Sequence, residues 1–350
     1  MYSDLYCFLL DIISPTTGIR GSRCHPHHQR STDSITPGDW YDCTSRRGYF
    51  LFCYTIGMTK PEARPRPYVG VSGVVNHKYN LPTGQTVTEP QDLFVEAYAD
   101  TAGLFKTNRM LALGVKATHM TQFQSRENKY GREWYPVGDE LTTALRPNRT
   151  NPNVTAVAQI YLDKNHVSNS HYRDVLVEAI ATRGQQWLQA IQFDMLPWHG
   201  NEGMLRFASG VREDYDVTVI LQCYKDIMDE LGPKRVVQRL GRYAYGIDYI
   251  LFDASHGTGQ RMDARRLGDF LHEAYSSTAL RHVNFAVAGG LDAQTVREDL
   301  PGLLAKYPEL SWDAEAKLHP INNMAKRPLQ MDITKAYLQA STDVIKKSSA

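Results

Sequence analysis

Three aspartates, each at the end of an apolar and β-branched run, are the residues of this sequence best placed for acid–base chemistry. They are Asp194, Asp253 and Asp313. Carboxyl groups that share one cavity can have their pKa values pushed apart, so that one stays protonated as an acid while another acts as a base. An aspartate at a strand end also commonly caps the following helix. The pattern therefore predicts a catalytic role for at least one of the three.

Polar residues at the ends of the other runs are candidates for contact with a substrate. Each of them can also be an ordinary polar residue at the rim of a fold. Asp163 and His166 do not join a larger set of ligands at metal-binding spacing, so neither a metal nor a cofactor is expected. The candidates are Ser72, Asn76, Lys116, His119, Asp163, Gln222, His256 and Glu315.

Two glycine-containing turns point to an anionic ligand. One comprises His256, Gly257, Thr258 and Gly259, and the other contains Gly289 and Gly290 directly ahead of a helical pattern. Glycine lets the main chain approach an anion closely, and a helix N-terminus adds a favourable dipole. A pair of glycines often marks only a tight turn, but two such turns after consecutive runs favour a phosphorylated ligand.

The elements that must position these residues alternate between strand and helix. Helical patterns such as Tyr172–Thr182, Asp226–Leu240, Ala264–Tyr275 and Thr295–Lys306 separate eight near-continuous apolar runs, which suit a parallel sheet buried on both faces. Eight such units predict a closed (β/α)8 TIM barrel, with Asp332–Lys347 as its last helix and the active site at the C-terminal ends of the strands. The runs are Val69–Val75, Leu111–Thr118, Val154–Leu162, Ala190–Met195, Val217–Tyr224, Tyr249–Ala254, Val283–Ala288 and Glu309–Ala314.

An open, doubly wound sheet is the alternative architecture. It would usually need more polar edge strands, and no Gly-x-Gly-x-x-Gly follows the first run, so the dinucleotide fingerprint is missing. We expect two regions in the chain: residues 1–57 without sustained periodicity, as an unstructured or non-native extension, and residues 58–350 as the barrel. Cysteines and histidines in the extension lack the paired spacings of a zinc site.

Composition excludes several classes of protein. Lys+Arg 39 against Asp+Glu 38 leaves a formal charge of +1, so no overall field attracts nucleic acid. No apolar stretch reaches the length that spans a bilayer. Only 5 cysteines occur, too few for a disulfide scaffold, so we expect a cytoplasmic protein with reduced thiols.

The sequence from Tyr249 to Leu291 resembles the phosphoribosylanthranilate isomerase family of tryptophan biosynthesis. The run Tyr249–Ser255 looks like that family's strand ending in the catalytic aspartate, and His256–Asp263 looks like its Gly-Gly-Thr-Gly loop. The turn Ala288–Leu291 resembles its phosphate-binding Gly-Gly-Leu turn. Gln192 is similar to the glutamine that ends its fourth strand, so we expect it to contact the substrate. Trp312-Asp313 is similar to its eighth-strand aspartate.

The resemblance implies a barrel of the ribulose-phosphate-binding kind that performs an Amadori rearrangement on a small phosphorylated ribose. Asp253 would then protonate the ring oxygen. The family's first strand carries Lys-x-Cys-Gly with the cysteine as base, whereas here Gly70 and Ser72 stand in the places of lysine and cysteine. An unassisted serine is too weakly acidic for that role. Asp194 or Asp313 is therefore expected to act as the base.

Three interpretations remain open on these residues. The first is an isomerase-like enzyme acting on a phosphorylated, N-linked ribose. The second is a hydrolase or transferase of N-ribosides or sugar phosphates, in which paired carboxyl groups flank the anomeric carbon. The third is a non-catalytic barrel that binds a sugar phosphate or nucleotide. The sequence does not indicate the aglycone or the oligomeric state.

Overall fold

The computed structural model of the chain divides into two units, Met1–Lys60 and Pro61–Ala350. In the first, β1 (Trp40–Thr44) pairs antiparallel with β2 (Phe50–Tyr54). The expected division at residues 57 and 58 stays a prediction. The structure describes residues 40–44, 50–54, 63–80, 83, 86–124, 135–137, 139–145, 151–161, 177–178, 180, 188–194, 196, 198, 202–255, 259–319 and 329–349.

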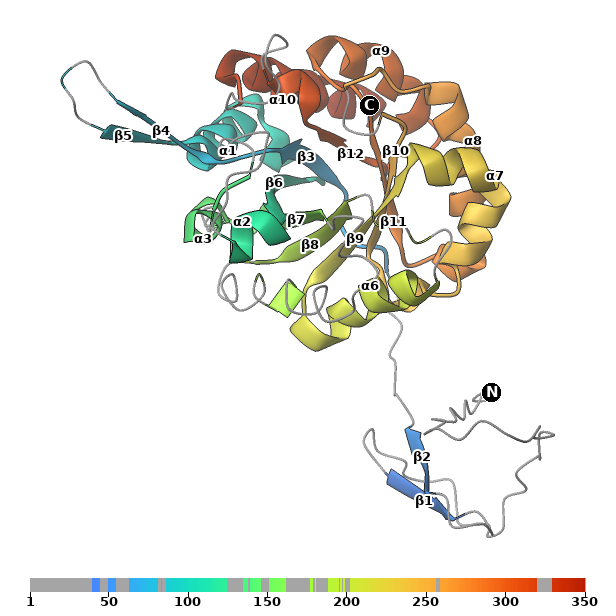
Figure 1. The fold of residues 1–350 in the computed structure, drawn as a ribbon. Coiled ribbons are helices and arrows are strands. Elements are labelled where there is room, and N and C mark those ends of the chain that lie inside the picture. Colours follow the sequence, from blue (N-terminus) through green and yellow to red (C-terminus); the bar gives the residue numbers. More distant parts are fainter. Residues whose placement is uncertain are drawn as a thin grey trace. The chain divides into compact units, whose positions relative to one another are not determined.

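Eight parallel strands of the second unit close into a barrel, which confirms the predicted (β/α)8 architecture (Figure 1). Around the barrel the order is β10-β11-β12-β3-β6-β7-β8-β9, so every strand neighbours the next one along the chain. The strands are β3 (Tyr68–Ser72), β6 (Met110–Thr118), β7 (Val154–Tyr161), β8 (Ala190–Asp194), β9 (Thr218–Tyr224), β10 (Tyr249–Asp253), β11 (Asn284–Ala288) and β12 (Ser311–Ala314).

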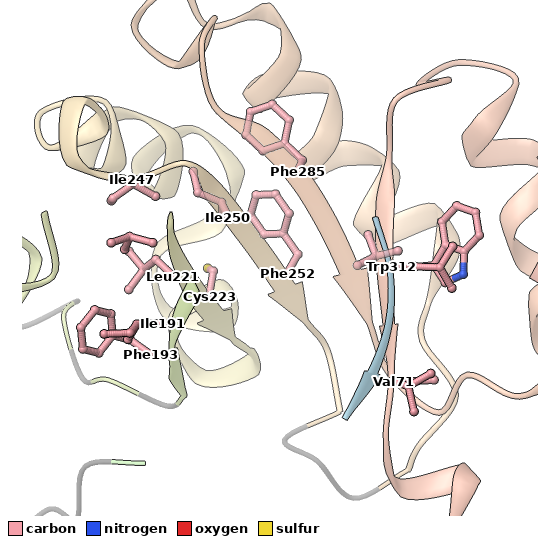
Figure 2. Close-up of a cluster of buried hydrophobic side chains, with 14 of the residues drawn as sticks. Val71, Ile191, Phe193, Leu221, Cys223, Ile247, Ile250, Phe252, Phe285 and Trp312 are labelled. Atoms are coloured by element: carbon pink, nitrogen blue, oxygen red, sulfur yellow. The ribbon is translucent and has the colours of Figure 1, made fainter. Parts of the chain in front are cut away.

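Alternate residues of each strand face opposite sides of the barrel wall. One set packs beneath the helices, and Figure 2 shows part of this cluster, including Phe193, Leu221, Phe252, Phe285 and Trp312. The other set forms a smaller cluster of inward residues that fill the barrel, with Tyr68, Val157, Tyr249 and Leu251 among them. Both faces of the barrel wall are therefore apolar toward the N-terminal ends of the strands, as the near-continuous runs predicted.

Helices cover the outside of the barrel wall (Figure 1). The predicted helices after the fifth, sixth and seventh strands are present, and α10 closes the ring as expected. The helix expected at Tyr172–Thr182 lies largely outside the described residues. The helices are α1 (Gln91–Ala102), α2 (His119–Phe123), α3 (Asp139–Ala144), α6 (Glu202–Tyr215), α7 (Lys225–Leu240), α8 (Ala264–Ser276), α9 (Ala293–Leu304) and α10 (Met331–Ser348), with 3-10 turns η1 (Leu104–Lys106), η2 (Ala244–Gly246), η3 (Thr278–Leu280) and η4 (Ala316–Leu318).

A hairpin stands between the first barrel strand and its helix, where the sequence had predicted only a connection. β4 (Asn76–Asn80) and β5 (Thr86–Pro90) pair antiparallel and extend away from the barrel (Figure 1). The first barrel strand accordingly ends at Ser72 rather than Val75. Gly73 makes this turn with a φ of 83°, and a Cβ there would lie 2.6 Å from Nε2 of His319.

Candidate active site

The C-terminal ends of the barrel strands carry a cluster of buried polar side chains. Asp194 ends β8, Asp253 ends β10, and Asp313 lies one residue before the end of β12. All three are at most 9% exposed. The charge of Asp194 acts on Asp313 and the charge of Asp253 acts on Asp194, so the three carboxyl groups share one electrostatic environment. The three aspartates thus lie at the same end of the barrel, and their catalytic roles stay a prediction.

Asp313 is the end of a chain of hydrogen bonds that crosses the interior. Ser72 Oγ lies 2.9 and 2.7 Å from its two carboxylate oxygens, and Gln159 Nε2 donates to Ser72 Oγ at 2.5 Å. Burial raises the pKa of Asp313 to about 8. The hydrogen bond from Ser72 opposes that rise, whereas the nearby Glu315 and Asp194 charges add to it. This carboxyl group therefore keeps its proton at neutral pH.

Two glycines make room for that chain. Gly70 is the register partner of Asp313, and a Cβ on Gly70 would lie only 2.4 Å from a carboxylate oxygen of Asp313. A Cβ on Gly114 would lie 2.6 Å from Gln159 Nε2 and 2.8 Å from Ser72 Oγ. A side chain at either glycine would thus displace the carboxyl group or its partners.

Asp194 and Gln192 occupy inward positions of the same strand, two residues apart. Gln192 Nε2 donates to Asp194 Oδ1 at 2.8 Å. Burial raises the pKa of Asp194 to about 6, while Lys116 and the Gln192 hydrogen bond oppose the shift. At pH 7 this carboxyl group is ionised, in contrast to Asp313.

Asp253 accepts hydrogen bonds on both oxygens. Gln222 Nε2 donates to Oδ2 at 3.0 Å, and the backbone N–H and hydroxyl of Ser255 both donate to Oδ1 at 2.8 Å. The first residues after β10 therefore hold the Asp253 side chain in place through Ser255.

Lys116 and Glu315 form a buried ion pair at the same mouth. Lys116 Nζ lies 2.6 Å from Glu315 Oε1 and 5.7 Å from the ring centre of Tyr135. Burial disfavours the charge on Lys116, but Glu315, Tyr135 and Asp194 outweigh it and raise its pKa above the ordinary value. The partner of Glu315, one of the predicted strand-end candidates, is thus a lysine.

The glycine turns pack against each other through their backbones. Gly259, Gly289 and Gly290 all have positive φ angles, and a Cβ on Gly290 would lie 2.6 Å from the carbonyl oxygens of Gly259 and Gln260. These geometries explain why glycine is required there.

The first amides of α9 are already capped. The side chain of Asp292 accepts hydrogen bonds from the backbone N–H groups of Gln294 and Thr295. A phosphate at this helix would therefore have to use the glycine amides or displace the cap.

Some predicted site residues cannot be placed. His256, Gly257, Thr258, Asp163 and the side chain of Asn76 lie outside what the structure describes. His119 is the first residue of α2, and its ring centre lies 5.0 Å from that of Phe123. Within the described parts of the chain, no group of three His, Cys, Asp or Glu residues could hold a metal. The described helices include none that could cross a membrane.

Sequence reasoning missed Gln159 altogether. It lies two residues before the end of β7, so a search of strand ends passes over it. Its register partners are Lys116 and Gln192, both of which were predicted to contact substrate. Register-paired residues of parallel strands face the same side, so strand pairing is the signal that could have found it.

Comparison with known structures finds distant likenesses. A monomeric form of the dimeric phosphoribosylanthranilate isomerase from Thermotoga maritima is 14% identical, with a TM-score of 0.46 over 79% of this chain and 99% of that chain. Rubisco from Pyrococcus horikoshii OT3 is 15% identical, with a TM-score of 0.44 over 81% and 58%. Triosephosphate isomerase from Bartonella henselae is 9% identical, with a TM-score of 0.41 over 81% and 100%.

Comparison with sequences is more specific over part of the barrel. A search of curated proteins finds no significant match. Residues 164–304 match the family model described as N-(5'phosphoribosyl)anthranilate (PRA) isomerase. The matched segment contains Asp194, Asp253 and both glycine turns, and it supports the expectation of an isomerase-like enzyme. The match over residues 164–304 agrees with the resemblance to this family that the landmarks from Tyr249 to Leu291 indicated.

Proposed function

We propose that this protein isomerises a phosphorylated, N-linked ribose by acid-catalysed ring opening and removal of a proton from C2. The observation that carries the proposal is the meeting of three buried aspartates at one barrel mouth, with pKa values of about 8 for Asp313 and about 6 for Asp194. Groups whose environments separate their pKa values on either side of neutrality can serve as acid and base in one reaction.

The proton inventory assigns the two roles. At pH 7 Asp313 is mostly protonated, so it is the proposed donor to the ring oxygen as the bond from C1 to that oxygen breaks. The nitrogen lone pair then forms a protonated imine at C1. Asp194 is mostly ionised and is the proposed base that removes the C2 proton. The electrons of that C–H bond form the enamine, which tautomerises to the ketose.

Asp253 takes a different role in this proposal from the one the resemblance implied. The resemblance made it the acid, whereas in this proposal Asp313 supplies that proton and three donors hold the Asp253 carboxyl group in a fixed orientation. A fixed carboxylate stabilises the positive charge of the imine that ring opening creates. We therefore assign electrostatic stabilisation to Asp253 and proton donation to Asp313.

The remaining candidates are proposed to bind the substrate. Ser72 and Gln192 border the carboxyl groups, and Lys116 supplies a positive charge paired with Glu315. The amides of Gly259, Gly289 and Gly290, with the loop residues His256, Gly257 and Thr258, are the proposed phosphate contacts. No cofactor is part of the proposal.

The test is the conversion of phosphoribosylanthranilate, followed by loss of its fluorescence. We expect turnover that Asp194→Asn, Asp253→Asn and Asp313→Asn each reduce, by a factor of about 10² to 10⁴ for a lost acid or base. Absence of turnover by the parent protein, or variants as fast as the parent, would count against the proposal. Release of the free aromatic amine without a ketose product would instead favour the hydrolase.

The pH dependence of kcat/KM tests the two roles separately. Activity should fall below about pH 6, where Asp194 gains a proton, and above about pH 8, where Asp313 loses one. The residual activity of Asp194→Asn should lack the acid limb, and that of Asp313→Asn the alkaline limb. If Asp253→Asn is the variant that removes the alkaline limb, the acid is Asp253 and our assignment is wrong.

A further inference from the structure

Gln159 reaches Asp313 through one intermediate side chain. Its amide nitrogen lies 2.5 Å from Ser72 Oγ, which in turn lies 2.7 and 2.9 Å from the carboxylate oxygens of Asp313. Gln159 is 2% exposed and Ser72 is 1% exposed, so solvent has little access to either group. The three side chains come from β7, β3 and β12, and they join distant parts of the sequence.

The chemistry of the amide sets the direction of this chain. An amide nitrogen donates hydrogen bonds and does not accept them. Ser72 Oγ must therefore accept from Gln159, and its single proton is directed to Asp313. With that donation in place, the acidic proton of Asp313 does not go to Ser72, and it remains available to another acceptor.

Glycines in the surrounding backbone leave room for this row of hydrogen-bonded side chains. Gly114 and Gly70 lack the side chains that would collide with Gln159, Ser72 and Asp313. Two further polar atoms, Oε1 of Gln159 and the hydroxyl of Tyr68, are buried without a hydrogen-bond partner among the described residues. The Tyr68 hydroxyl also lies within the influence of the Asp313 charge.

We propose that Gln159 is a positioning residue that acts through Ser72 to keep the acidic proton of Asp313 directed toward the substrate. The catalytic consequence rests on the proposed isomerase function. The hydrogen-bond arrangement itself can be tested without a substrate. Neither the family match, which begins at residue 164, nor the strand-end pattern assigns a role to Gln159.

Gln159→Met removes the donor and keeps the approximate length of the side chain. Ser72 can then turn and accept the proton of Asp313, and a hydrogen bond to the neutral carboxyl group raises its pKa further above about 8. Gln159→Glu should raise it more, because a carboxylate attracts the Ser72 proton and adds negative charge. The other charged or titratable groups acting with Asp313 are Glu315, Asp194, Lys116, Tyr68 and Tyr337.

The experiment is a carbon-13 NMR titration of the free, full-length protein with labelled aspartate carboxyl groups, in which Asp313→Asn identifies the Asp313 signal. We expect Gln159→Met to raise the Asp313 midpoint by about one pH unit, a tenfold change in its proton affinity. The matched control is Gln222→Met, which removes the amide donor of Asp253 instead. It should leave the Asp313 midpoint in place.

An unchanged Asp313 midpoint in Gln159→Met overturns the proposal, and so does an equal shift in Gln222→Met. Should Gln159→Met fail to fold, Gln159→Glu and Ser72→Ala provide the same titration, and an unshifted midpoint in both likewise overturns it. With substrate, Gln159→Met should lower kcat about tenfold with little change in KM and move the alkaline limb upward. A titration shift without any turnover supports the positioning role and contradicts only the isomerase proposal.

Discussion

At the scale of single residues, each aspartate of the site has its own donor. Gln192 serves Asp194, Gln222 serves Asp253, and Ser72 serves Asp313. The number of donors differs, and so does the balance of neighbouring charges, which leaves Asp313 protonated and Asp194 ionised at neutral pH. Three identical side chains thereby acquire different chemistry from their surroundings.

Gly70→Ala tests whether the space beside Asp313 is required. The added methyl would lie 2.4 Å from a carboxylate oxygen, so the carboxyl group must move. We expect a loss of about 1–3 kcal/mol in the free energy of unfolding from overpacking, and a larger loss of activity. Urea unfolding and turnover of phosphoribosylanthranilate measure the two effects.

Gly302→Ala is the control for Gly70→Ala. Gly302 is an exposed residue of α9, a methyl group added there would meet no atom within 4 Å, and alanine favours a helix. The substitution should leave activity unchanged and stability equal or slightly higher. Full activity of Gly70→Ala would mean that Asp313 tolerates displacement, contrary to its proposed role as the acid.

The sequence could place Asp194, Asp253 and Asp313 because each stands near a strand end. It could not supply Gln159, since the link from β7 to β12 passes through Ser72 on a third strand. The departure from the resemblance at Ser72 was visible, but its role was not. The structure makes Ser72 a hydrogen-bond donor to the carboxyl group rather than a substitute for a cysteine base.

At the scale of elements, the strands and most helices followed from the apolar runs, whereas the β4–β5 hairpin did not. Its strands are short and mostly polar, so nothing in the apolar pattern distinguishes an inserted hairpin from a loop. In the second half of the barrel, Asp263 caps α8 and Asp292 caps α9. Strand ends therefore indicated the candidate residues, whereas the apolar pattern did not indicate how the strands are connected.

Arg109 ties together two strands at the opposite end of the barrel from the site. Its guanidinium donates to the carbonyl oxygens of Leu310 at 2.5 Å and Pro308 at 2.7 Å, just before β12, and lies 4.6 Å from the ring centre of Trp312. Arg109 itself precedes β6, so the bonds pass across β3, which lies between these two strands. The carbonyl groups would be left without these donors if Arg109 were replaced.

Arg109→Met should therefore lower the free energy of unfolding by about 2–4 kcal/mol, from two lost hydrogen bonds to a charged group. Arg297→Met is the control, because Arg297 is exposed and bonds within its own helix, to Ala293. It should change stability by less than about 0.5 kcal/mol. Equal urea midpoints for the two variants would show that Arg109 does not join the strands energetically.

At the scale of the whole molecule, residues 64–66, which precede the first barrel strand, form hydrogen bonds near the N-terminal ends of several other strands. The carbonyl of Pro65 accepts from Asn284 at the start of β11, and that of Arg66 accepts from Tyr249 at the start of β10. The Arg66 guanidinium donates to Asn153, before β7, and to the carbonyl of Arg109. Arg64 donates to the carbonyl of Arg281 and lies 4.4 Å from the ring centre of Tyr275.

Two truncated chains that differ by only a few residues test whether residues 64–66 stabilise the barrel. A chain of residues 61–350 keeps every contact of Arg64, Pro65 and Arg66, and it corresponds to one of the two structural units. We expect its urea midpoint and its turnover to equal those of the barrel in the full chain. A chain of residues 68–350 loses these hydrogen bonds, each worth about 0.5–1.5 kcal/mol, and should unfold at a clearly lower urea concentration.

If residues 61–350 were already destabilised, the first unit would contribute to the barrel, and the predicted boundary near Met58 would be wrong. If the urea midpoint of residues 68–350 equalled that of the full chain, residues 64–66 would not stabilise the barrel, and its closure would depend on the strands and helices alone.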